Sequence, residues 1–430
     1  MENAPQLNLG ELTARAEKGD AGAQYRLAAA LQQAGRGAEA APWLEKAVVA
    51  GHPGALYTRA SERLAGPPEK MHPAETAASL KRAVDAGGAA AARLLAVMTA
   101  LGLGAPANEA DAVRLVIKAA QAGHPAALRE LALLAHGLGA AGAESARVLL
   151  RLAAMRGDWI ALYLALRFCG VFNVKEGEGL SAQLSAAGAP LAERLQDPTG
   201  PCAREAAAGA IDYTRLENLL TAPFARSLPS REDFHQHPDV VKCSGVLTPL
   251  ECDYLICVSA SLLAPSRVVD SHKGAADLAN FRTSDGALIG LADLDLALIG
   301  IYRRLAAVMG APAENCELMG VLRYRVGQEY LPHHDYLPED AADYSEVRRS
   351  GQRTHTLLVT LNDGFKGGAT AFPDLNKSVR ASAGDGVIFD NTDDAGVPLP
   401  QSLHAGEPVT GGEKWIVTLW RRAKPFWFWV

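Results

Sequence analysis

The chain has 430 residues, and at roughly 150 residues per domain this length predicts two or three domains. Hydrophobic residues make up 49% of the chain but aromatic residues only 6%, which favours closely packed helices over an all-β protein, at least in the alanine-rich first half. The net charge of −6 provides no basic field able to hold a phosphate backbone, so we expect no nucleic-acid partner.

The amino-terminal residues 1–8 contain neither a basic nor an apolar targeting region, and no stretch approaches the about 18 apolar residues that span a bilayer. We therefore expect a cytoplasmic protein without a membrane partner. The six cysteines form no Cys-x-x-Cys pair, which predicts buried free thiols and neither a zinc site nor a disulfide framework.

A repeat runs through the first half of the chain. Glycines follow short helical runs at intervals of 31 to 36 residues, and an alanine stands four positions after each glycine. The glycines are Gly19, Gly51, Gly87, Gly123, Gly157 and Gly188, and the alanines are Ala23, Ala55, Ala91, Ala127, Ala161 and Ala192. Glycine ends a helix in the left-handed conformation at little cost, and alanine lets the next helix approach closely. The pattern predicts a solenoid of stacked helix pairs, with an ordinary alanine-rich helical domain as the alternative.

Residues 18–28 and 122–132 carry this motif most clearly, and the region from about 8 to 196 resembles tetratricopeptide-type repeats of the Sel-one-like variety. The resemblance implies a surface that binds protein, and by itself no chemistry. The register ends at Gln196. Turn-rich segments at 197–201 and 227–238 flank a predicted helix at 212–222, where we expect the domain junction.

The second half changes to short β-branched segments between turns, after two helical patterns around 248–263 and 294–308. The predicted strands are 322–326, 354–361, 386–389 and 414–420, which suggests a sandwich or jelly roll. The predicted fold class is therefore multidomain α and β. We expect an α-solenoid at 1–196, a linker with a short helix at 197–237, and a β domain with flanking helices at 238–430.

Four residues of this β domain suggest a metal site. His333 and Asp335, at the end of a strand-like stretch, are two apart and can share one face, while His334 points away. A later histidine, His404, would complete a facial triad of two histidines and one carboxylate, which suits Fe(II). Lys414 follows ten residues later and could hold the remote carboxylate of a 2-oxo acid. Taken singly, these residues could also be a turn pair, a core histidine and a solvated strand-end charge.

Six ordered blocks then carry a resemblance of residues 238–422 to the catalytic domain of prolyl 4-hydroxylases, within the 2-oxoglutarate and Fe(II)-dependent dioxygenases: 281–284, 323–336, 353–362, 367–373, 384–389 and 403–420. The resemblance implies a double-stranded β-helix, iron bound by His333, Asp335 and His404, and the C5 carboxylate of 2-oxoglutarate on Lys414. Tyr324 and Thr356 would line the cosubstrate pocket, unless they are ordinary core residues. Thr360 stands where some relatives carry a tyrosine that contacts the cosubstrate.

The implied cofactors are Fe(II), 2-oxoglutarate and O2, with ascorbate as an accessory reductant. Three functions stay open. The first is a hydroxylase of prolyl residues in a peptide or protein client recruited by the repeats. The second is the same chemistry on another residue or a small molecule, and the third is a silent scaffold. The client, the hydroxylated carbon and the oligomeric state are open at this stage.

Two polar loops, 270–286 and 336–352, are candidate lids over a substrate, although the second is equally well a solvated surface loop. The tail 424–430 concentrates aromatic residues, and we expect it to pack against the sheet or the solenoid, with a partner contact as the alternative.

Overall fold

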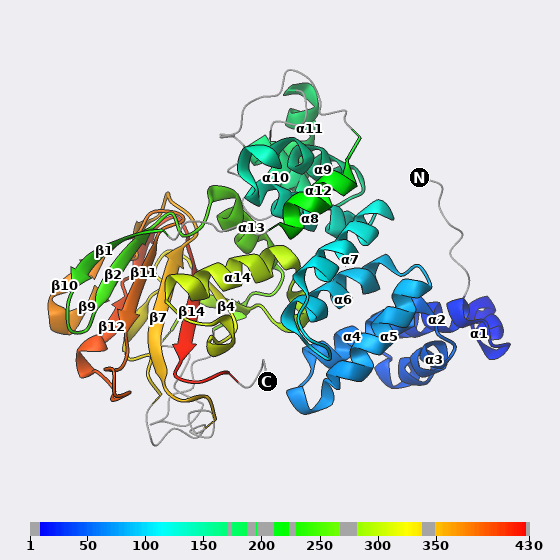
Figure 1. Cartoon of the computed structure of the whole chain (residues 1–430), viewed down its shortest axis with the longest axis horizontal. Helices are drawn as coiled ribbons and strands as arrows, with labels where there is room; N and C mark the ends of the chain where they lie inside the picture. Colours follow the sequence, from blue (N-terminus) through cyan, green and yellow to red (C-terminus); the bar gives the residue numbers. More distant parts are fainter. Residues whose placement is uncertain are drawn as a thin grey trace. The chain divides into compact units, whose positions relative to one another are not determined.

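The computed structural model (Figure 1) describes residues 9–169, 174–186, 195, 210–222, 229–266, 282–337 and 349–426. By its internal contacts the chain divides into two compact units. The repeat unit comprises Met1–Asp158, Gly209–Ala222 and Leu291–Leu296, and the sheet unit comprises Trp159–Ala208, Pro223–Gly290 and Ala297–Val430.

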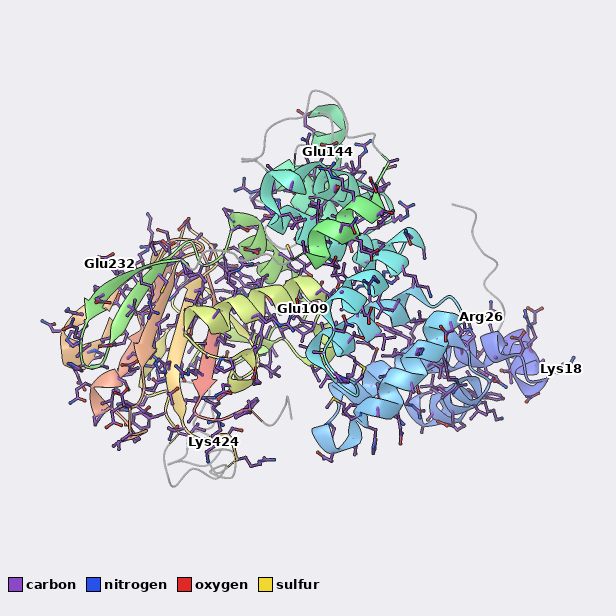
Figure 2. The ribbon with its side chains drawn as sticks, in the orientation of Figure 1. Lys18, Arg26, Glu109, Glu144, Glu232 and Lys424 are labelled. Carbon is purple, nitrogen blue, oxygen red and sulfur yellow. The ribbon has the colours of Figure 1, made fainter. Side chains whose placement is uncertain are left out.

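The repeat unit is built of helices that pack on their neighbours along the chain. They are α1 (Leu9–Glu17), α2 (Ala21–Gln33), α3 (Gly37–Val49), α4 (Pro53–Ala65), α5 (Pro73–Asp85), α6 (Ala89–Leu101), α7 (Glu109–Gln121), α8 (Pro125–Gly137), α9 (Ala143–Met155) and α12 (Tyr213–Thr221). The charged residues of this unit that Figure 2 labels are exposed: Lys18, in the turn after α1, and the helix residues Arg26, Glu109 and Glu144.

The glycine and alanine positions of the repeat behave as predicted wherever the structure describes them. Five repeat glycines have φ angles of 75° to 89°, the left-handed conformation that ends a helix: Gly19, Gly51, Gly87, Gly123 and Gly157. The alanines four positions later have exposed fractions of 0 to 1%: Ala23, Ala55, Ala91, Ala127 and Ala161. Gly188 and Ala192 lie outside the described residues. The solenoid is thus held by close helix contacts at alanine.

Two histidines begin helices of the repeat, a feature that the sequence analysis missed. The Nδ1 atoms of His52 and His124 accept hydrogen bonds from the backbone N–H of Ala55 (3.4 Å) and Ala127 (3.3 Å). A proline follows each histidine at the first helical position, where a missing N–H costs nothing. Burial, reinforced by nearby arginines, lowers the pKa of His124 to about 4, which leaves the ring neutral and able to accept.

A buried ionic cluster lies in the repeat unit. The carboxylate of Glu130, whose side chain is fully buried, accepts from Arg93 Nε at 2.8 Å and from the backbone N–H of Leu296 at 2.7 Å. Asp295 lies 3.8 Å from the same arginine. Each buried charge here has an opposite charge or a backbone dipole beside it, which is what burial requires.

The sheet unit holds an eight-stranded antiparallel sheet in the order β1-β2-β11-β7-β14-β5-β4-β3, a four-stranded sheet β10-β9-β12-β6, and the pair β13-β8. The larger sheet consists of β1 (Ser230–His235), β2 (Val240–Ser244), β3 (Ala264–Pro265), β4 (Asp285–Leu288), β5 (Gly320–Tyr324), β7 (Arg353–Thr360), β11 (Gly386–Asp390) and β14 (Lys414–Arg422). The others are β6 (Tyr330–His333), β8 (Lys366–Gly367), β9 (Thr370–Phe372), β10 (Lys377–Val379), β12 (His404–Gly406) and β13 (Val409–Gly411).

Apolar side chains from both sheets meet between them. One cluster joins Val240 and Phe389 of the larger sheet to Phe372 and Val379 of the smaller one. This two-layer antiparallel arrangement is the predicted jelly roll. The helices of the unit are α10 (Trp159–Leu164), α11 (Val174–Ala186), α13 (Pro249–Ala260) and α14 (Leu296–Val308). The first residue of α14, Leu296, is counted with the repeat unit.

Several smaller predictions can be compared with the structure. Four cysteines are buried thiols, as expected: Cys243, Cys252, Cys257 and Cys316. Within the described part of the chain, no helix is long and apolar enough to cross a membrane. In the aromatic tail, Phe426 is 7% exposed, and its backbone N–H donates a hydrogen bond to the carbonyl oxygen of Glu314 at 2.7 Å. Residues 427–430 lie outside the described residues. The candidate lid loops lie largely outside them too, at 267–281 and 338–348.

Candidate active site

Two strands of the smaller sheet and one bend bring the three predicted metal ligands together. His333 ends β6 and His404 begins β12, and the two residues face each other in the antiparallel register of this strand pair. Because β6 ends at His333, Asp335 lies in a bend, and its approach to the histidine comes from that bend and not from strand alternation. His334 turns away, as expected, with Nε2 2.9 Å from the carbonyl oxygen of Pro400.

The donor atoms of the three side chains converge. Nε2 of His333 lies 3.7 Å from Oδ1 of Asp335, and Nε2 of His404 lies 3.6 Å from Oδ2. One ligand atom from each residue lies within 4.8 Å of the others. All three side chains are at most 8% exposed.

Hydrogen bonds from the second ring nitrogens fix the orientation of both imidazoles. Nδ1 of His333 lies 2.8 Å from the carbonyl oxygen of Leu331, and Nδ1 of His404 lies 3.0 Å from that of Ser402. A carbonyl oxygen only accepts, so Nδ1 carries the proton and Nε2 keeps its lone pair. The ring of Tyr330 stacks on His333 with centroids 3.5 Å apart.

A second set of contacts positions the carboxylate. The hydroxyl of Thr356 on β7 donates to Oδ2 of Asp335 at 2.6 Å and accepts from the Asn391 amide at 2.9 Å. Behind this pair, Arg353 donates to the Asp335 carbonyl oxygen at 3.4 Å and forms a bidentate pair with Glu317 at 2.7 and 2.8 Å.

The electrostatics of the cluster suit a cation. Burial alone would raise the pKa of Asp335, but attraction to His404, His333 and Arg353 and the Thr356 hydrogen bond outweigh it and lower the pKa to about 2. Burial, helped by repulsion from His404, lowers the pKa of His333 to about 3. Near neutral pH, Asp335 is therefore ionised and His333 neutral, which are the states that bind metal.

Two imidazole nitrogens with free lone pairs and one ionised carboxylate form the donor set of a facial triad. This set leaves neighbouring coordination positions open and matches non-haem Fe(II). The residues present therefore fit an iron ion.

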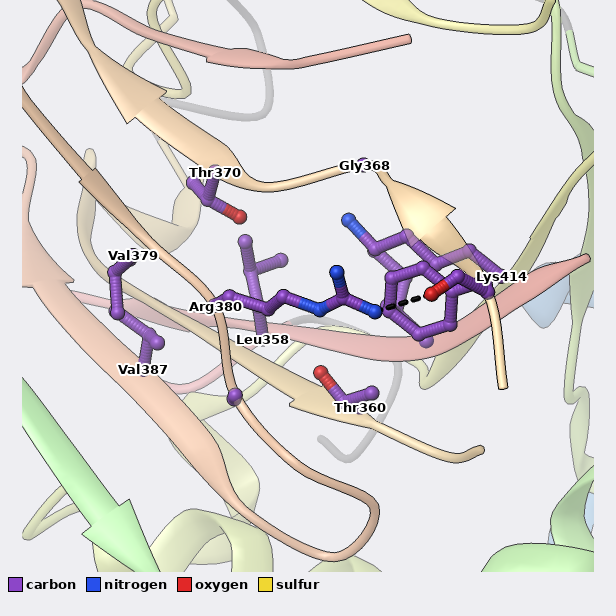
Figure 3. A pocket seen from close by; sticks show the side chains of 11 residues that line it. Leu358, Thr360, Gly368, Thr370, Val379, Arg380, Val387 and Lys414 are labelled. Atoms are coloured by element: carbon purple, nitrogen blue, oxygen red, sulfur yellow. Dashed lines mark hydrogen bonds between the residues drawn. The ribbon is translucent and has the colours of Figure 1, made fainter. Parts of the chain in front are cut away.

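A small pocket lies around the Nζ end of Lys414 (Figure 3). Lys414 begins β14 opposite Tyr324 of β5, and its Nζ lies 5.6 Å from the Tyr324 ring centroid. Its exposed fraction is 6%. The pocket is lined by Leu358, Thr360, Phe365, Gly368, Thr370, Val379, Arg380, Ala381, Val387, Lys414 and Ile416.

One face of β7 connects the pocket to the triad. Thr356 bonds to Asp335, and Leu358 and Thr360 line the Lys414 pocket. These three residues alternate along the strand, so their side chains share a face, and the four-residue separation corresponds to about 13 Å. A short chain molecule lying along β7 can thus reach from the metal ligands toward Lys414.

The structure separates the predicted pocket residues by role. Thr360 and Lys414 line the pocket, whereas Thr356, expected there, donates its hydroxyl to Asp335. Sequence reasoning missed Asn391, Arg380 and Thr370. Arg380 and Asn391 lie outside the six blocks of the resemblance, and Thr370 lies inside the block 367–373, which gives no sign of its role.

Comparisons with known proteins agree with this geometry. The sequence model of the 2OG-Fe(II) oxygenase superfamily matches residues 319–422. Prolyl 4-hydroxylase 1 of Arabidopsis thaliana is 36% identical over 201 residues, which covers 44% of this chain and 70% of the relative. Prolyl 4-hydroxylase 2 of the same plant is 33% identical over 230 residues, covering 48% and 75%.

Two solved structures are similar to separate parts of the chain. The 2OG complex of a viral collagen prolyl hydroxylase from Paramecium Bursaria Chlorella virus-1 has a TM-score of 0.33 and 26% identity, covering 43% of this chain and 96% of the other. A Sel1 repeat protein from Oxalobacter formigenes has a TM-score of 0.35 and 23% identity, covering 42% and 78%.

The fold, the donor set and the superfamily match define an enzyme class, the 2-oxoglutarate- and Fe(II)-dependent dioxygenases. The cofactors of this class are Fe(II) and 2-oxoglutarate, with O2 as the oxidant. Within the class, this chain belongs to the prolyl 4-hydroxylase family.

Proposed function

We propose that the protein hydroxylates a prolyl residue in a peptide or protein client. In the overall reaction 2-oxoglutarate and O2 become succinate and CO2, and one oxygen atom is inserted into a C–H bond of the client. The observation that carries the proposal is the convergence of the His333, Asp335 and His404 donor atoms on the β7 face that leads to Lys414. The relatives named prolyl 4-hydroxylases support proline as the residue.

The side chains have distinct roles in this proposal. Nε2 of His333, Nε2 of His404 and the Asp335 carboxylate hold iron, which with 2-oxoglutarate supplies the oxidising chemistry when bound. The carbonyl oxygens of Leu331 and Ser402, which contact Nδ1 of the two histidines, hold the imidazoles in place. The Thr356 hydroxyl does the same for the Asp335 carboxylate. Lys414 holds the C5 carboxylate, and the burial of the cluster limits access of water.

We also propose the domain division predicted above, with repeats at 1–196, a linker at 197–237 and the oxygenase at 238–430. Ascorbate as accessory reductant and the contacts of Tyr324 and Thr360 with the cosubstrate stay predictions.

We infer that the repeats recruit the client through an acidic segment. A groove of about 580 Å³ runs between α5, α6 and α7, with Leu95, Met98 and Leu115 among its apolar lining residues. Lys81 and Lys118 line it as exposed cations. An apolar floor with cations at its edge complements a peptide in which acidic and apolar residues alternate.

The chemistry is tested with a panel of proline-containing peptides, Fe(II) and 2-oxoglutarate, with mass spectrometry of the products. We expect a gain of one oxygen atom on proline, matched by an equal amount of succinate. If succinate forms together with oxidation of another residue or of a small molecule, that molecule and not proline is the substrate. Absence of succinate with every substrate would contradict the enzyme assignment itself.

The groove is tested with a fluorescent peptide of alternating glutamate and leucine. We expect the charge reversals Lys81→Glu and Lys118→Glu together to weaken its binding, whereas Lys18→Glu, at an exposed site in the turn after α1, leaves it unchanged. Equal binding by the double variant would contradict the proposed docking surface.

A further inference from the structure

Two cations share the small pocket at the start of β14. Arg380 follows β10, and its side chain reaches into the pocket toward the Nζ end of Lys414 (Figure 3). The guanidinium donates a hydrogen bond to the carbonyl oxygen of Phe365 and lies 4.5 Å from the centroid of that ring. Arg380 thus has a defined place on the pocket wall, although nothing in its sequence context marks it.

These two cations lack an anionic partner in the described part of the chain, where no carboxylate oxygen lies within 4.0 Å of either. Glu407, an acidic group that acts on Lys414 electrostatically, accepts a hydrogen bond from the Ser378 hydroxyl at 3.3 Å. Burial, followed by repulsion from Arg380, lowers the pKa of Lys414 to about 8. Lys414 is buried, and a buried cation with a second cation beside it is costly unless an anion completes the site.

We propose that Arg380 is a second anchor for the remote carboxylate of the 2-oxo acid, and that together with Lys414 it selects dicarboxylic 2-oxo acids over monocarboxylic ones. This inference rests on the proposed function, because it assigns a further residue to the same cosubstrate site.

The remaining walls favour this assignment. Leu358, Val387 and Ile416 are apolar, and the hydroxyl-bearing Thr360 and Thr370 supply no charge. A 2-oxo acid that ends in a methyl group would leave both cations unpaired, whereas a carboxylate can accept from both.

The free space of the pocket indicates how the carboxylate is received. The cavity volume is about 20 Å³, room for one water-sized group. A carboxylate oxygen takes this space when the guanidinium turns from the Phe365 carbonyl toward the ligand. Arg380 is exposed along part of its length, so the turn disturbs no packed core.

The test measures binding by calorimetry under nitrogen with Mn(II) in place of iron, using the full chain. The two probes are 2-oxoglutarate and 2-oxopentanoate, which has the same carbon chain but a methyl group at C5. We expect Arg380→Gln to weaken 2-oxoglutarate binding about tenfold, the effect of losing one hydrogen bond to a charged group. Binding of 2-oxopentanoate stays unchanged, and Arg380→Lys recovers part of the loss.

Lys377→Gln is the matched control, because Lys377 lies on β10 but donates to the carbonyl oxygen of Phe234, away from the pocket. We expect it to bind both probes as the unmodified protein does. An equal loss for both probes in Arg380→Gln, or no loss for either, would overturn the inference while leaving the proposed function intact. An unmodified protein that binds neither probe would overturn the proposed function and this inference with it.

Discussion

The repeat unit and the sheet unit both bury paired charges, but the described part of the sheet unit also buries a cation, Lys414, that has no carboxylate within ion-pair distance. In the repeat unit, Glu130 lies against Arg93, and Arg129 likewise pairs with Asp158. The sheet unit contains such a pair too, in Arg353 and Glu317. It also holds three converging side chains of metal-ligand type and, at Lys414, a buried cation with Arg380 beside it. Burial of charge therefore does not by itself indicate function; burial without a matching charge does.

The physical reason lies in the cost of desolvation. A buried ion is tolerated when a fixed opposite charge or several hydrogen bonds compensate for the lost water. Where the chain leaves this compensation incomplete, a ligand can provide it. The following predictions test this contrast between the two units.

The largest effect is expected at the triad. His404→Ala should abolish 2-oxoglutarate-dependent succinate formation, a loss greater than the roughly 10–100-fold that removal of a ligand's supporting partner causes. His334→Ala is the matched control, because this ring contacts the Pro400 carbonyl oxygen and points away from the cluster. Retained succinate formation in His404→Ala would refute the metal assignment.

In the repeat unit, the paired charges should matter for stability. Glu130→Ala leaves Arg93 with only the more distant Asp295, at 3.8 Å, and removes the acceptor of the Leu296 N–H, at a cost of about 3 kcal/mol in the free energy of unfolding. Chemical denaturation measures it. Glu144→Ala removes an exposed carboxylate and should cost less than about 1 kcal/mol. Equal stability of the two variants would remove the contrast between paired and exposed charge.

The support of Asp335 should have an intermediate effect. Thr356→Val removes the hydroxyl that donates to the carboxylate and should weaken metal binding by roughly tenfold. Titration with Mn(II) measures the change. Thr354→Val, on the same strand with its hydroxyl on the Arg421 carbonyl oxygen at 3.3 Å, should bind metal normally. Identical affinities of the two variants would assign Thr356 to packing alone.

The smallest effect is a pH dependence at Lys414. The pKa of this lysine is lowered to about 8, so the ammonium is charged below that pH and loses its proton as the pH rises through it. Binding of 2-oxoglutarate should therefore weaken between pH 7 and pH 9. In Lys414→Arg the dependence should disappear, because arginine keeps its charge throughout this range. A decline that persists unchanged in this variant would have another origin.

Local sequence patterns predicted helices of the repeat unit and strands of the sheet unit. Gly51 and Ala55 show why: a helix end and a helix contact each depend on a few neighbouring residues. The connector helix predicted at 212–222 is α12, and the strand predicted at 354–361 is β7 at Arg353–Thr360. The short strand β8, Lys366–Gly367, was not among the predicted strands, and it forms because β13 pairs with it across a long stretch of sequence.

The sequence by itself determined the repeat periodicity, the jelly-roll character of the second half and the order of the residues His333, Asp335, His404 and Lys414. Periodicity and motif order are properties of the linear sequence, so they can be found without coordinates. Only the tertiary structure placed the Thr356 hydroxyl on Asp335 and brought Arg380 beside Lys414. These contacts join residues from distant strands, and their geometry depends on strand register and on how the two sheets pack.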